Sequence, residues 1–117
     1  MEVLFVDDSI GYVLKIIGDV DASSSIILDN ALEEALEATE GNIFIDCFEL
    51  DYIASAGIGV FTSRLHSQSG GRQIMLYGVN DKIMNTFKVL GLHKLLPLYA
   101  TKEELISVLA DGTANQG

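Results

Sequence analysis

The serine with the most unusual surroundings lies in the segment Ala-Ser-Ala-Gly-Ile-Gly at residues 54–59. Small residues and glycine are poor choices for the start of a helix unless another group must approach the backbone closely. Two interpretations of Ser55 are open. Its hydroxyl either caps the following helix by accepting a bond from a free backbone N–H, or it is displayed at a strand-to-helix turn. A phosphate on a displayed hydroxyl would face free N–H groups and the positive end of the helix dipole.

Other chemistries find little support in the residue spacing. A serine hydrolase needs a base beside its nucleophile, and Ser55 has no histidine nearby in the sequence and no Gly-x-Ser-x-Gly context. His66 and His93 have no cysteine or carboxylate at metal-ligand spacing. Gly57-Ile58-Gly59 lacks the remainder of either nucleotide-binding fingerprint. We therefore expect no catalytic residue, no metal and no cofactor, in a chain that is not an enzyme.

Size and charge limit the possible partners. The 117 residues are enough for one domain with a buried core. Seventeen acidic residues against seven basic ones give a net charge of -10, which argues against nucleic acid and against anionic membrane surfaces. The negative charge either favours a basic protein partner or only keeps the protein soluble.

The cellular compartment is indicated by three features. Cys47 is the one cysteine and cannot form an internal disulfide, which fits a reducing compartment. The first residues lack the pattern of a signal peptide, and the longest uncharged stretch, at residues 52–63, is too short to span a bilayer. The expected location is the cytoplasm, without membrane contact.

The hydrophobic pattern predicts alternating strands and helices. Apolar runs at 3–6 and 12–17 predict a hairpin, and further strands are predicted at 43–47, 72–77 and 95–99. Pro97 lacks an N–H, so the last strand is expected at a sheet edge, and residues 49–52 are predicted to be a loop. Helices are predicted after the serines at 23–25, from Ala54 to before Gly70, from Asn80 or Asp81 to Gly91, and after a Thr101–Glu104 capping box. This order implies a mostly parallel sheet with helical cover.

One predicted helix carries a row of acidic residues. Asp29, Glu33 and Glu37 recur at four-residue steps, on a different face from the apolar Leu28, Ala31, Leu32 and Ala35. The acidic row is either a solvated face or a docking surface for a basic partner.

The residues at 46–60, Asp-Cys-Phe-Glu-Leu-Asp-Tyr-Ile-Ala-Ser-Ala-Gly-Ile-Gly-Val, resemble the signature of the STAS domain and are most similar to that of bacterial anti-sigma factor antagonists. Segments 18–21 and 79–92 extend the resemblance over nearly the whole chain. The resemblance implies an α/β fold, a mixed, mostly parallel sheet with helices packed mainly on one side. We expect one such domain at residues 1–110 and a disordered tail at 111–117, which is small and polar.

The resemblance also implies a mechanism. Such an antagonist binds an anti-sigma factor that is a serine kinase, and thereby releases the sigma factor. The kinase switches the antagonist off by phosphorylating a serine, here Ser55, and a metal-dependent serine phosphatase reverses the modification. Asp21 corresponds to the loop aspartate beside that serine. Ala54 and Ala56 stand where the family has Asp and Ser or Thr.

A contact surface around the serine follows from the predicted helix. With Ile58, Phe61 and Leu65 buried, Arg64 and Gln68 are expected to point outward beside the turn. The expected partner-binding residues are Asp21, Ser55, Gly57, Arg64 and Gln68. Two alternatives remain: a STAS scaffold or transport-complex subunit that is not phosphorylated, and a small serine hydrolase based on Ser55.

Overall fold

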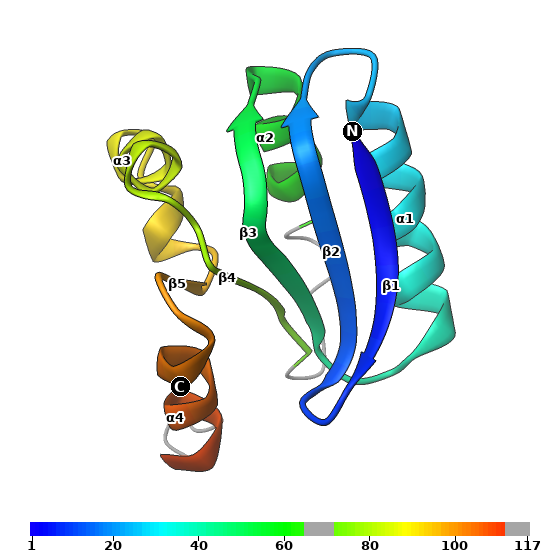
Figure 1. The fold of residues 1–117 in the computed structure, drawn as a ribbon, viewed down its shortest axis with the longest axis vertical. Coiled ribbons are helices and arrows are strands. Elements are labelled where there is room, and N and C mark those ends of the chain that lie inside the picture. Colours follow the sequence, from blue (N-terminus) through cyan, green and yellow to red (C-terminus); the bar gives the residue numbers. More distant parts are fainter. Residues whose placement is uncertain (65–71, 112–117) are drawn as a thin grey trace.

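A computed structural model of the protein describes residues 1–64 and 72–111, which form a five-stranded sheet with helices on both faces (Figure 1). The elements in chain order are β1 (Glu2–Asp8), β2 (Gly11–Val20), α1 (Ser25–Ala38), β3 (Ile43–Ile53), α2 (Ser55–Arg64), β4 (Ile74–Tyr77), α3 (Asp81–Val89), the short 3-10 helix η2 (Leu92–Lys94), β5 (Leu98–Tyr99) and α4 (Lys102–Asp111).

The strands lie side by side in the order of the sequence, from β1 to β5. β1 and β2 form an antiparallel hairpin, and every later neighbour is parallel. Parallel neighbours need crossover connections, and α1, α2 and α3 supply them. The predicted mixed, mostly parallel sheet is confirmed.

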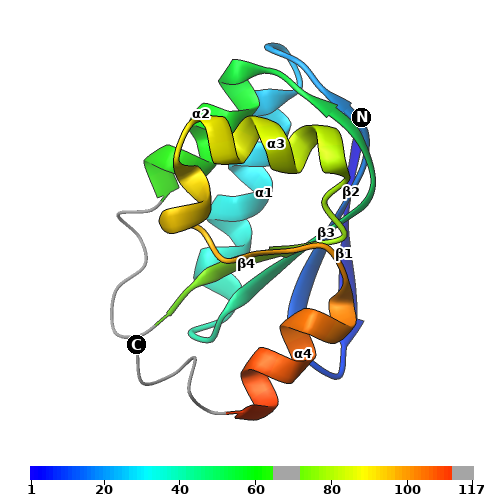
Figure 2. The same ribbon diagram turned by 90° about the vertical axis from the view of Figure 1, so that its left-hand side faces the viewer.

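Alternation of side chains along the strands divides the core between the two sheet faces. The larger cluster lies between the sheet and α1, α2 and α3, and includes Ile16, Leu32, Ile45, Phe61 and Phe87. The smaller cluster, on the opposite face, is covered by α4; its members are Val13, Phe44, Met75, Tyr77 and Leu105. Figure 2 shows α4 apart from the other three helices. Helices therefore pack mainly on one side, as expected.

β3 is longer than the sequence predicted. Residues 49–52 continue the strand and pair with the end of β2, so their prediction as a loop is wrong. The pairing contains two register shifts, between Lys15 and Ile17 and between Gly18 and Asp19. Leu50 is buried whereas Glu49 is exposed, because only one face of this part of the strand is covered. The uncovered face of residues 49–52 carries polar side chains, and in the sequence such a segment resembles a loop.

Two of the predicted helix caps are confirmed. The Asn80 side chain accepts a hydrogen bond from the Ile83 N–H at 2.8 Å, and the Thr101 hydroxyl accepts one from the Glu104 N–H at 3.1 Å.

β5 is an edge strand, as predicted, but it is shortened to two residues because η2 precedes it. Of the predicted tail at 111–117, Asp111 ends α4 and the rest lies outside the described residues. Among the described helices, none has the length and apolar content to cross a membrane.

Two neighbouring residues on α4, Leu105 and Ile106, should contribute very differently to the free energy of unfolding. Leu105 is fully buried, whereas Ile106 is 41% exposed. Leu105→Ala should lower the free energy of unfolding by about 2–5 kcal/mol, because it leaves a cavity against the sheet. The control Ile106→Ala should cost less than about 1 kcal/mol. Urea denaturation of both variants measures the difference, and equal losses would show that α4 does not cover this face.

Candidate functional site

The ends of β2 and β3 bring two loops of the chain together. Val20 pairs with Ile53 at the last position of each strand, and the Ala54 N–H donates to the Val20 carbonyl at 2.8 Å. Figure 1 shows the two strands ending side by side at the same edge of the sheet. Asp21 and Ser55 follow these strand ends directly, so the structure places the two predicted site residues on neighbouring turns.

Ser55 is the first residue of α2 and is exposed. Ala54, not Ser55, occupies the capping position, because its carbonyl accepts from the N–H groups of Gly57 and Ile58 at 2.9 and 3.0 Å. Within residues 1–64 and 72–111, no hydrogen-bond partner is found for the Ser55 hydroxyl, nor for the N–H groups of Ser55 and Ala56. The capping interpretation is therefore wrong, and the hydroxyl is displayed at a helix start with free amides.

Asp21 organises the turn between β2 and α1. Its Oδ1 accepts hydrogen bonds from the Ser23 hydroxyl at 2.9 Å, the Ser24 hydroxyl at 2.8 Å and the Ser24 N–H at 2.9 Å. The bonds from the Ser24 N–H and hydroxyl, and then from the Ser23 hydroxyl, lower the pKa of Asp21 to about 2. Asp21 is thus ionised near neutral pH and holds the serine turn beside the start of α2.

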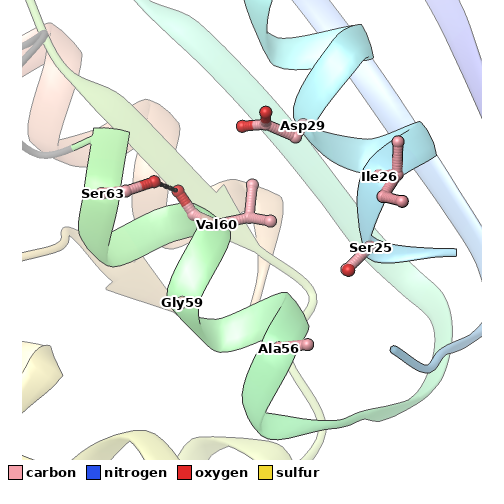
Figure 3. Close-up of a pocket in the computed structure, with 7 residues that line it drawn as sticks. All are labelled: Ser25, Ile26, Asp29, Ala56, Gly59, Val60 and Ser63. Atoms are coloured by element: carbon pink, nitrogen blue, oxygen red, sulfur yellow. Dashed lines mark hydrogen bonds between the residues drawn. The ribbon is translucent and has the colours of Figure 1, made fainter. Parts of the chain in front are cut away.

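A groove of about 290 Å³ runs between α1 and α2, beginning one residue after Ser55 (Figure 3). We call it the α1–α2 groove; it is lined by Ser25, Ile26, Asp29, Ala56, Gly59, Val60 and Ser63. Ala56 and Gly59 are small and exposed, so the α2 side of the groove leaves the helix backbone open to close approach.

Arg64 does not point outward as expected. Its side chain is only 18% exposed and forms ion pairs with Asp29, at 2.9 Å, and with Glu33. The Arg64 Nε donates to the same Asp29 Oδ1 at 3.0 Å. Because Asp29 and Glu33 belong to α1, Arg64 ties the end of α2 to α1 beside the groove. Two of the three residues of the acidic row, Asp29 and Glu33, are thereby used within the protein, which neither interpretation of the row anticipated.

Gly57 is buried and packs against the ends of two strands. A Cβ at this position would lie 2.7 Å from both Ile53 Cγ1 and Val20 Cγ1. Glycine is needed here because α2 packs closely on the ends of β2 and β3. A bulky substitution at Gly57 would therefore disturb the packing of α2 on the sheet. Gln68 and Leu65 lie outside the described residues.

Sequence reasoning missed the exposed apolar residues around the two turns. Ile26 is 63% exposed, Ile27 52% and Tyr52 49%. A signal was available for the isoleucines, because they lie off the apolar face that contains Leu28 and Leu32. Large exposed apolar side chains near a groove are typical of a protein interaction surface.

The sequence profile of the STAS domain matches residues 3–105. The chain belongs to the STAS domain family. Membership of this family agrees with the mixed sheet described above.

Individual relatives agree with this assignment. The anti-sigma-B factor antagonist of Listeria monocytogenes is 28% identical over 90 residues, covering 75% of this chain and 78% of that protein. The structure of an anti-sigma-factor antagonist (STAS) domain protein from Planctomyces limnophilus has a TM-score of 0.77 at 13% identity, covering 92% of this chain and 97% of that one. The phosphorylated form of the Bacillus cell fate determinant SpoIIAA has a TM-score of 0.62 at 20% identity, covering 91% and 99%. At these identities the two structures show the fold alone. The Listeria relative carries the name of an antagonist and not of an enzyme, in agreement with the expectation that this STAS domain is not an enzyme.

Two glycines of α2 should respond oppositely to the same substitution. Gly57→Ala should destabilise the protein by about 1–3 kcal/mol, because the new methyl group overlaps Ile53 and Val20. Gly59→Ala should be neutral or stabilising by up to about 1 kcal/mol, because nothing lies within 4 Å of its Cβ position and alanine favours a helix. Chemical denaturation measures both. A Gly57→Ala variant as stable as the wild type would contradict the close packing of α2.

The hydrogen bonds of Asp21 predict a pH-dependent contribution to stability. The pKa of Asp21 is about 2 in the folded protein against an ordinary value of 3.8. The stabilisation is therefore fully present above pH 3.8 and is lost as pH falls towards 2. The difference in melting temperature between wild type and Asp21→Asn should be largest above pH 4 and shrink towards pH 2. A difference that stays constant over this range would show that the ionised carboxylate does not stabilise the turn.

Proposed function

We propose that this STAS domain is an anti-sigma factor antagonist that binds an anti-sigma factor serine kinase and is switched off by phosphorylation of Ser55. The observation that carries the proposal is the exposed Ser55 hydroxyl, displayed without a described hydrogen-bond partner at the start of α2, next to Ala56, which lines the α1–α2 groove. The names of the relatives support the same role.

The surface around Ser55 has the composition of a docking site. The α1–α2 groove is lined by small residues on the α2 side and by the exposed Ile26 on the α1 side. Ile27 and Tyr52 add exposed apolar area close in sequence to the two turns. The ionised Asp21 keeps its serine turn ordered, so a partner meets a preformed surface. A net charge of -10 favours a partner with a basic rim.

Phosphorylation would change this surface without disrupting the fold. A phosphate brings about -1.5 to -2 charges at pH 7, and the free amides and positive dipole end of α2 stabilise it where it forms. Ala54 leaves no carboxylate directly before Ser55, which reduces repulsion toward the phosphate. When the partner docks, the added charge must lose its water, which costs several kcal/mol if it stays unpaired. Removal of the phosphate by a serine phosphatase in the cytoplasm restores binding.

The proposal is tested with the anti-sigma factor kinase encoded in the same genome, purified and supplied with ATP. Intact-mass spectra should show one added phosphate on the wild type and on the control Ser9→Ala, and none on Ser55→Ala. Ser9 is exposed in the turn between β1 and β2 and does not line the α1–α2 groove. Phosphate on another residue, with Ser55 unmodified, would contradict the proposed switch.

Measuring how tightly Ser55 variants bind the same kinase distinguishes the effect of the added charge from the contribution of the serine itself to docking. In calorimetry, Ser55→Ala should bind within about twofold of the wild type, and Ser55→Asp at least about tenfold more weakly, which corresponds to about 1.4 kcal/mol. Tight binding without any phosphorylation would instead support a STAS scaffold that is not regulated in this way.

A further inference from the structure

A second cavity, of about 430 Å³, lies between α3 and α4 at the side of the sheet formed by β4 and β5. We call it the α3–α4 crevice; its lining residues are Val79, Asp81, Met84, Lys88, His93, Leu98, Ala100 and Glu104. Its volume lies within the range of about 300–1,000 Å³ that small-molecule sites occupy. None of these residues lines the α1–α2 groove.

The chain topology explains why a crevice forms here. After β4 the chain enters α3, which packs on the face with the larger core cluster, whereas after β5 it enters α4, which packs on the opposite face. β4 and β5 are parallel neighbours. Figure 2 shows α3 and α4 on either side of them. Where connections from adjacent parallel strands leave toward opposite faces, a crevice opens beyond the strand ends, and α/β proteins commonly bind ligands there.

The charged residues of the crevice are sorted into two ends. Asp81 is the first residue of α3, and Glu104 lies in the first turn of α4. Lys88 is seven residues after Asp81, or about 10 Å further along the helix axis, and His93 follows in η2. Within the described part of the chain, Asp81, Lys88 and His93 take no part in an ion pair. The crevice therefore presents acceptors at one end and donors at the other.

Apolar side chains separate the two ends. Val79 is 4% exposed, and Met84 and Leu98 are partly buried against the larger core cluster. Glu104 also accepts a hydrogen bond from the Ala100 N–H at 3.2 Å, which fixes its carboxylate at the acidic end. A ligand carrying only one charge would pair with one end and leave the other unmatched.

We propose that the α3–α4 crevice binds a small zwitterionic molecule, whose anionic group pairs with Lys88 and His93 and whose cationic group pairs with Asp81 and Glu104. An apolar spacer of about 10 Å, the length of two helical turns, lies across Met84 and Leu98. This site is separate from Ser55 and does not depend on the proposed switch.

The test uses linear ω-amino acids of increasing length as probes, titrated into ¹⁵N-labelled protein. Amide shifts should move at Val79, Asp81 and Ala100. Affinity should peak near 8-aminooctanoate, whose charged groups are about 10 Å apart when extended, a match to the spacing of Asp81 and Lys88. Octanoate and octylamine, which each carry one of the two charges, should bind at least about tenfold more weakly. If no ω-amino acid binds more tightly than both of these compounds, the proposal is wrong.

Variants on α3 locate the site independently of probe chemistry. Lys88→Gln and Asp81→Asn should each weaken the best probe by about fivefold or more. Lys82→Gln removes the same charge from an exposed position of α3 that does not line the crevice, and it should leave the affinity unchanged. Equal losses for Lys88→Gln and Lys82→Gln would show a nonspecific charge effect and overturn the assignment.

Discussion

The parallel pairing of β2 with β3, carried to the last residue of each strand, is the constraint on which the candidate site depends. The Ala54 N–H bonds to the Val20 carbonyl beyond the final strand pair, and so fixes where α2 begins relative to β2. This single register places the Asp21 turn beside Ser55. A shift by one residue would turn the buried Ile53 toward solvent and remove the packing on which α2 rests.

Two contacts then fix α2 in the orientation that exposes Ser55. Gly57 allows the helix to approach Ile53 and Val20 closely, and Arg64 joins its last turn to Asp29 and Glu33 of α1. Gly57 is buried, and the Arg64 side chain is only 18% exposed. Both are better described as supports of the α1–α2 groove, whose width they set from opposite ends of α2.

The sequence predicted features that depend on local chemistry, and missed those that depend on tertiary contacts. The caps at Asn80 and Thr101 and the edge position of β5 follow from residue type and spacing, and the STAS signature led to the fold class and to the choice of Ser55. The extension of β3 through Glu49 was missed because a strand covered on one face carries polar residues that look like a loop. The close packing of Gly57 and the inward ion pairs of Arg64 were missed because the neighbours that decide them, Val20 and Asp29, are distant in sequence. The exposure of Ile26 is equally a property of how α1 sits on the sheet.

The central claim is that a phosphate at Ser55 changes the surface and leaves the fold intact. The most direct measurement compares amide spectra and hydrogen exchange of the protein with serine and with phosphoserine incorporated at position 55. Shift changes should be confined to residues 21–26 and 54–59, and the exchange of β3 amides should be unchanged. Loss of protection along β3, or an absence of shift changes in the Asp21 turn, would contradict the account.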